Sequence, residues 1–154
     1  MSVLDNALQA LLLNGCKVKK LWTNAASGSD FPAQKISLSM AKYDAALIEL
    51  KASKSDTASE YCRICFKGKD DWADAFANAQ RDAVVEIRTR QYSVSSTGVN
   101  FQSGYGKSVS SMSSSVRNDY AIPSTIYGIQ LLGGVIHKLK TLAASLFLRR
   151  EVLA

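Results

Sequence analysis

Histidine and cysteine are scarce in this chain of 154 residues, which has a single histidine, His137, and three cysteines. A serine or cysteine triad needs a histidine base beside its nucleophile, and His137 belongs to no such motif. Cys16, Cys62 and Cys65 form no even disulfide framework. Cys62 and Cys65 stand in a C-x-x-C pattern, but a structural zinc site needs four converging ligands, and residues three apart face opposite sides of a strand. We therefore expect reduced thiols, no metal, no cofactor and no enzymatic activity.

A long uninterrupted apolar run is also absent. Residues 1–6 carry no positive charge, and the apolar run Leu11-Leu12-Leu13 is too short for a signal peptide. The longest apolar-rich segment, residues 126–148, contains His137, Lys138 and Lys140. Such a segment is a poor membrane span. We predict no membrane insertion, and synthesis and assembly in the cytoplasm.

Charge is present but not concentrated. The net charge is +6, yet only 21% of the residues are charged and they are spread along the chain. Residues 87–118 contain basic side chains and no acidic one. Arg88, Arg90 and Tyr92 alternate there and could offer a cationic stacking surface to nucleic acid. Alternation on a solvent-facing strand explains the same residues, so we favour a solvated face and expect no nucleic-acid partner.

Two short motifs suggest chemistry that the rest of the pattern does not support. Residues 104–108 read Gly-Tyr-Gly-Lys-Ser, but a phosphate loop also needs a glycine at the position of Phe101. Asp70, Asp71 and Asp74 are clustered, but the spacing and terminal glutamate of a calcium loop are missing. We interpret the three aspartates as solvated loop carboxylates and expect neither nucleotide nor calcium binding.

Two amphipathic helices are predicted, one near each end of the sequence. Residues 3–13 have apolar residues at helical spacing before Gly15, and residues 135–150 follow the break at Gly133-Gly134. The first stripe comprises Leu4, Leu8, Leu11 and Leu12, and the second comprises Ile136, Leu139, Leu142 and Leu146. Burying a leucine side chain is worth roughly 1.5–3 kcal/mol, so each stripe should contact the domain, another copy or a partner protein. We favour an intersubunit contact for the second helix.

The period of two between the helices is typical of strands. Strands are expected near residues 17–22, 36–38, 43–51, 61–66, 85–94, 99–101 and 125–131. Residues 70–82 fit either a helix or a strand, and we favour a strand. Seven of the fourteen residues from Ser103 to Val116 are serine, which indicates an exposed loop that could carry binding function.

These elements predict a mainly β fold, an antiparallel β-sandwich of jelly-roll-like type with a short N-terminal helix and a C-terminal amphipathic helix. The expected organisation is an N-terminal helix at 1–16, a sandwich domain at 17–132 and a helical extension at 133–154. Trp22 and Tyr127 are expected to pack near each other. The inner face should carry Ile36, Leu38, Leu47, Ile64, Val85, Ile87, Val99 and Phe101.

Segments on either side of the strand-patterned region carry a family resemblance. The first is Leu-Trp-Thr-Asn at 21–24, followed by Phe-Pro-Ala-Gln at 31–34 and the strand at 43–51; the last is Ile-Pro-Ser-Thr-Ile-Tyr-Gly-Ile at 122–129. In this order the chain resembles small phage virion proteins, the β-sandwich modules of tail fibres, baseplates and head decorations. The resemblance covers roughly residues 20–130, and such modules often stop soon after the last segment.

The resemblance implies a non-enzymatic structural or adhesive component of a phage particle, located in the virion. It implies a homo-oligomer, with a trimer favoured, that contacts other virion proteins and a host surface glycan during attachment. Tyr105 and the two leucine stripes are the candidate interaction residues. Two alternatives stay open: a stand-alone carbohydrate-binding module using Tyr92, Tyr105 or Tyr120, and a basic nucleic-acid-binding β protein.

Overall fold

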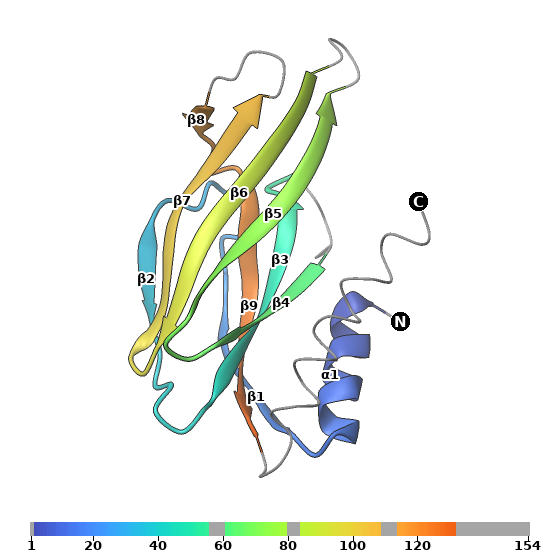
Figure 1. Cartoon of the computed structure of the whole chain (residues 1–154), viewed down its shortest axis with the longest axis vertical. Coiled ribbons are helices and arrows are strands. Elements are labelled where there is room, and N and C mark those ends of the chain that lie inside the picture. Colours follow the sequence, from blue (N-terminus) through green and yellow to red (C-terminus); the bar gives the residue numbers. More distant parts are fainter. Residues whose placement is uncertain (1, 56–60, 80–83, 109–113, 132–154) are drawn as a thin grey trace.

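The computed structural model describes residues 2–55, 61–79, 84–108 and 114–131 and is mainly β, with two antiparallel sheets and one helix (Figure 1). The elements follow the order α1 (Val3–Leu13), β1 (Lys17–Thr23), β2 (Gln34–Ser37), β3 (Ala45–Ser53), β4 (Tyr61–Phe66), β5 (Asp70–Ala79), β6 (Val84–Ser95), β7 (Gly98–Ser108), β8 (Ser114–Val116) and β9 (Tyr120–Gln130). The helix predicted at residues 135–150, and with it the extension at 133–154, lies outside the described residues.

The four-stranded sheet has the order β1-β9-β3-β4, and the five-stranded sheet has the order β2-β7-β6-β5 with β8 also paired to β7. β2 and β8 pair with successive parts of β7, because β2 reaches Phe101 and β8 begins opposite Lys107. β1 pairs with β9, so residues 20–23 and 125–127, which are far apart in the sequence, are neighbours in space. Consecutive strands β5, β6 and β7 form a meander of long strands.

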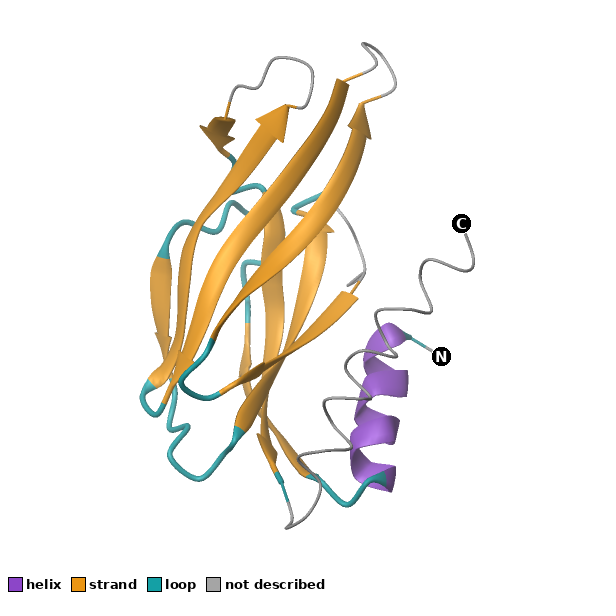
Figure 2. Ribbon diagram, in the orientation of Figure 1, coloured by secondary structure: helices purple, strands orange, loops and turns teal. Residues whose placement is uncertain are grey.

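The two sheets pack face to face and enclose the main core, which gives a sandwich-like arrangement (Figure 2). Its members come from both sheets and include Ile48 and Ile126 on one side and Tyr92 and Phe101 on the other. Successive side chains of a strand point to opposite faces. Ile48 therefore faces this core while Leu47 faces the other way.

A second apolar cluster covers the outer face of the four-stranded sheet, where α1 packs. Leu47 and Ile64 belong to this cluster, so their expected place between the sheets was wrong. Tyr127 also lies here, whereas Trp22, which pairs with the adjacent Ile126, packs against the core between the sheets; the two segments meet as expected, but the side chains of Trp22 and Tyr127 lie on opposite faces and do not pack together. β3 is central and apolar on both faces, which explains why its sequence does not show a clean alternation.

α1 begins with a capping box, in which the Ser2 hydroxyl accepts from the Asp5 amide and the Asp5 carboxylate accepts from the Ser2 amide. Leu11 is buried, and Leu4 and Leu8 pack partly buried against the same cluster. Leu12 does not share that face, because its side chain is 59% exposed. The helix therefore covers its own sheet with three of the four predicted leucines.

The strand favoured for residues 70–82 is confirmed for Asp70–Ala79. The loop predicted for residues 103–116 was wrong for residues 103–108, which belong to β7, and for residues 114–116, which form β8; residues 109–113 lie outside the described residues. Gly104 pairs with Arg90 and Gly106 pairs with Arg88 across the β6–β7 ladder. The glycines therefore leave room beside two large side chains in a sheet, although such a composition is more typical of a loop.

An arginine-anchored sheet as the candidate functional site

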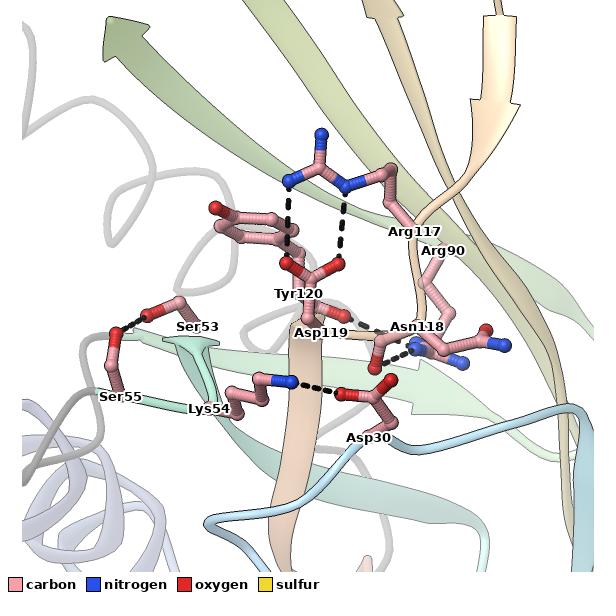
Figure 3. A network of polar contacts seen from close by, with 9 residues as sticks. All are labelled: Asp30, Ser53, Lys54, Ser55, Arg90, Arg117, Asn118, Asp119 and Tyr120. Atoms are coloured by element: carbon pink, nitrogen blue, oxygen red, sulfur yellow. Dashed lines mark hydrogen bonds and ion pairs between the residues drawn. The ribbon is translucent and has the colours of Figure 1, made fainter.

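Arg90 is the most unusual side chain of the described structure, because it is fully buried and bonds to backbone carbonyls. Its Nε donates to the carbonyl of Ala121 at 3.0 Å, and its Nη1 donates to that of Gln102 at 2.7 Å. Its Nη2 donates to the carbonyls of Tyr120 at 3.1 Å and Asn118 at 3.5 Å (Figure 3). Burial lowers the pKa of Arg90 to about 10, so the guanidinium stays charged at neutral pH.

This arrangement ties the segment that leads from β8 into β9 to the five-stranded sheet. The Gly104 amide donates to the Asn118 side chain at 3.0 Å, and the Arg117 amide donates to the Gly104 carbonyl at 2.7 Å. A Cβ atom at Gly104 would overlap the Arg117 carbonyl and come within 3.0 Å of the Arg90 guanidinium. Glycine at this position therefore allows the close approach of backbone and arginine.

A stack of charged and aromatic groups lies beside this anchor. The guanidinium carbons of Arg88 and Arg117 lie 3.3 Å and 5.0 Å from the centre of the Tyr120 ring. Arg117 also forms a two-point ion pair with Asp119, with both nitrogen–oxygen distances at 3.2 Å. Burial alone would raise the pKa of Asp119, but hydrogen bonds and the positive charges of Arg117 and Arg88 outweigh it and hold that pKa below its usual value.

The charged residues of this region therefore stabilise the fold through hydrogen bonds, an ion pair and stacking on Tyr120. Arg88, Arg90 and Tyr92 are all buried, so the solvent-facing surface expected for them was wrong, and so was the stacking surface that they could have offered to nucleic acid. Tyr92 donates from its hydroxyl to Asp71 at 3.0 Å on the inner side. Tyr92 and Tyr120 are thus unsuitable as freely exposed aromatic platforms for a sugar.

The outer face of the five-stranded sheet carries three exposed apolar side chains: Trp72 is 49% exposed, Tyr105 is 48% exposed and Val116 is 56% exposed. Trp72 pairs with Gln91 in the β5–β6 ladder. Thr89, two residues along β6 from Gln91, pairs with Tyr105, which in turn pairs with Val116. Directly paired residues and residues two apart share a face. The three apolar side chains therefore lie on one surface, which we call the outer sheet face.

A β-bulge shapes the middle of the outer sheet face. Tyr92 pairs with Phe101 and Arg90 pairs with Gly104, so Gln91 of β6 stands opposite both Gln102 and Ser103 of β7. Bulges of this kind bend a strand and often redirect side chains near functional sites. A hollow of about 220 Å³ lies here, lined by Asp70, Gln91, Tyr92, Ser93 and Gln102. Because the Gln102 carbonyl accepts from Arg90, the buried anchor holds the bulge from inside.

Of the predicted interaction residues, Tyr105 is exposed on the outer sheet face, and Leu4, Leu8 and Leu11 contact their own sheet. The second stripe, Ile136, Leu139, Leu142 and Leu146, lies outside the described residues. Sequence reasoning missed Trp72 as a site residue, and it considered Arg90 only as a side chain on a solvent-facing strand. Trp72 could have been found as an aromatic residue between aspartates on one face of a strand, and Arg90 through the two glycines paired with β6 arginines.

The C-x-x-C thiols point in opposite directions, as predicted. Cys65 lies in the core between the sheets, while Cys62 packs beneath α1. Burial, together with the charge of Glu49, raises the pKa of Cys62 to about 12, and burial with nearby aspartates raises that of Cys65 to about 12. Both are therefore protonated thiols at neutral pH, and they cannot bind one shared metal ion from opposite faces.

Among the residues that the structure describes, no three histidine, cysteine or acidic side chains are grouped as metal ligands would be. None of the helices described is long and apolar enough to cross a membrane. No known family, curated protein or solved structure matches this chain. The function must therefore be argued from the geometry and from the residues themselves.

Proposed function

We propose that this protein is a non-enzymatic structural or adhesive component of a phage particle, acting by self-assembly and surface contact. The observation that carries the contact role is the outer sheet face, where Trp72 and Tyr105 are about half exposed on strands paired along their length. The assignment to a tail fibre, baseplate or head decoration rests on the sequence segments at 21–24, 31–34 and 122–129. Beneath this face, Arg90 of β6 bonds to the carbonyl of Gln102 on β7 and to those of Tyr120 and Ala121 on β9.

The proposal includes a jelly-roll-like connectivity and a C-terminal helix. Pairing of β1 with β9 and of β2 with β7 supports a jelly-roll-like nesting of early and late strands, whereas the β3–β4 hairpin and the β5–β6–β7 meander depart from it. The apolar stripe in residues 135–150 would dock on another copy, with a trimer favoured.

Purified particles test the location. An antibody raised against the pure protein should label particles banded in a density gradient, and mass spectrometry of that band should recover the chain in fixed proportion to the other particle proteins. Recovery only in the soluble fraction of the lysate would contradict a virion role. A β-sandwich protein from the same lysate that is not part of the particle serves as the control.

Light scattering on the full chain and on a chain ending at Leu132 tests the assembly. We expect the full chain to be an oligomer and the shorter chain to stay folded with a smaller mass. An unchanged mass after truncation would contradict an intersubunit role for residues 135–150. Loss of folding would instead assign that segment to the core of its own domain.

A further inference from the structure

The outer sheet face combines two exposed aromatic rings with a polar hollow between their strands. Trp72 is on β5 and Tyr105 is on β7, with β6 between them. The register places them two strands apart across the sheet and two residues apart along β6. With about 4.8 Å between strands and 3.4 Å per residue, their Cα atoms are about 12 Å apart. One small ligand could not cover both rings, whereas an extended chain of rings could.

The polar groups that line the hollow are donors and acceptors, and they lie beside Trp72, with Asp70 and Ser93 on the side of Trp72 away from Tyr105. The amides of Gln91 and Gln102 offer both functions, the Ser93 hydroxyl offers both, and the Asp70 carboxylate accepts. Asp70 and Gln102 are exposed, and Gln91 and Ser93 are half-buried. A sugar ring presents hydroxyl groups around its edge and C–H groups on its face. The hydroxyl groups can hydrogen-bond with the polar residues of the hollow, and the C–H face can stack on the aromatic rings.

The size and charge of the hollow narrow the class of ligand. Its volume of about 220 Å³ is below the roughly 300–1,000 Å³ typical of drug-sized ligand sites, and fits a ring-sized group better than a large cofactor. Among the described residues that line it, Asp70 supplies a negative charge and none is basic. A phosphate or an acidic sugar would be repelled by Asp70 at this point, and the exposed Lys107 lies outside the hollow, two residues along β7 from Tyr105.

A protein partner fits this surface less well. Stable protein interfaces bury about 800 Å² per partner around an apolar centre. Here a polar hollow lies directly beside the exposed Trp72, and the exposed Tyr105 lies two residues further along β6 in the other direction, so the apolar area is not continuous. Aromatic rings beside a polar hollow instead provide stacking and orientation together, which a chain of neutral sugar rings requires.

We propose that the outer sheet face binds a neutral oligosaccharide chain, with Trp72 and Tyr105 as stacking platforms and Gln91, Gln102 and Asp70 as hydrogen-bonding residues. This inference deepens the adhesive part of the proposed function and rests on it. Arg90 is a positioning residue for this site, because its guanidinium holds the Gln102 carbonyl at the bulge from the buried side.

An array of neutral polysaccharides, including dextran, mannan, β-glucan and galactan, tests this with the full-length protein, and calorimetric titration then measures the affinity for the strongest binder. Trp72→Ala and Tyr105→Ala should each weaken binding by about tenfold or more, the loss typical of an aromatic anchor. Leu13→Ala is the matched control, because Leu13 is an exposed apolar residue on α1, and it should leave binding unchanged. Circular dichroism checks that each variant is folded.

Gln102→Ala gives a second readout if an aromatic variant fails to fold, because Gln102 is exposed and its backbone bond to Arg90 is retained. It should weaken binding several-fold. Equal affinity in all variants, binding lost at high salt, or no binding to any polysaccharide would overturn the inference. A chain found in the particle without polysaccharide binding would refute this inference alone. Binding that depends on Trp72 and Tyr105 in a protein absent from particles would refute only the phage assignment.

Discussion

Replacing Arg90 by alanine should destabilise the protein far more than replacing other arginines. The guanidinium makes three hydrogen bonds of 2.7–3.1 Å to the carbonyls of Gln102, Ala121 and Tyr120. Hydrogen bonds to a charged group contribute about 1.5–3 kcal/mol each, which totals roughly 5–9 kcal/mol. Burying the charge costs several kcal/mol. We therefore expect Arg90→Ala to lower the free energy of unfolding by about 3–5 kcal/mol, since the carbonyls lose their donor and a cavity remains.

Arg117→Ala is the matched control for this variant. Arg117 is partly exposed and pairs with Asp119, so its loss should lower the free energy of unfolding by about 1 kcal/mol or less. The loss in free energy of unfolding for Arg90→Lys should lie between those of Arg90→Ala and Arg117→Ala. A lysine ammonium keeps the charge, but it cannot reach all the carbonyls that the three nitrogens of a planar guanidinium reach.

Urea unfolding, followed by circular dichroism and by tryptophan fluorescence, measures these differences by linear extrapolation. Trp22 is a useful local reporter because its ring lies 6.4 Å from that of Phe31, which itself lies beneath the Arg90 guanidinium. A loss for Arg90→Ala no larger than that for Arg117→Ala would refute the reasoning. It would mean that the carbonyls find other partners without Arg90.

Three further outcomes follow from the same structure. Cys62 and Cys65, whose pKa values burial raises to about 12, should react with a thiol reagent at pH 8 many times more slowly in the native protein than in urea; equal rates would contradict their burial. Asp119 has a lowered pKa, so its contribution to stability is present above the ordinary value of 3.8 and is lost as pH falls below it. Urea unfolding at several pH values from neutral to acid should show that the free energy of unfolding decreases more steeply with falling pH for the wild type than for Asp119→Asn. Gly128→Ala should destabilise the protein by about 1–3 kcal/mol, because its Cβ would lie 2.6 Å from the Tyr43 ring. Thermal unfolding of Gly128→Ala checks this against Gly28→Ala, whose Cβ would make only an ordinary contact of 3.9 Å with the Lys54 carbonyl oxygen.

Much of the local structure could be predicted from the sequence. The helix at residues 3–13 follows from its apolar spacing and from Gly15, and the strands at 61–66 and 70–79 follow from a period of two. These features depend on neighbours along the chain. The same local reasoning failed for residues 103–108 and 114–116, which are strands although their serine and glycine content is typical of a loop.

The sequence by itself determined that the chain would be mainly β, with a short helix near residues 3–13. Only the tertiary structure decided which faces are buried. Arg88 and Arg90 are interior because Gly104 and Gly106 stand opposite them, and the partners of Arg90 come from two distant segments of the chain. The meeting of Trp72 and Tyr105 on one face depends on strand register across β6. That register includes the bulge opposite Gln91, and an alternating sequence pattern does not show where a bulge falls.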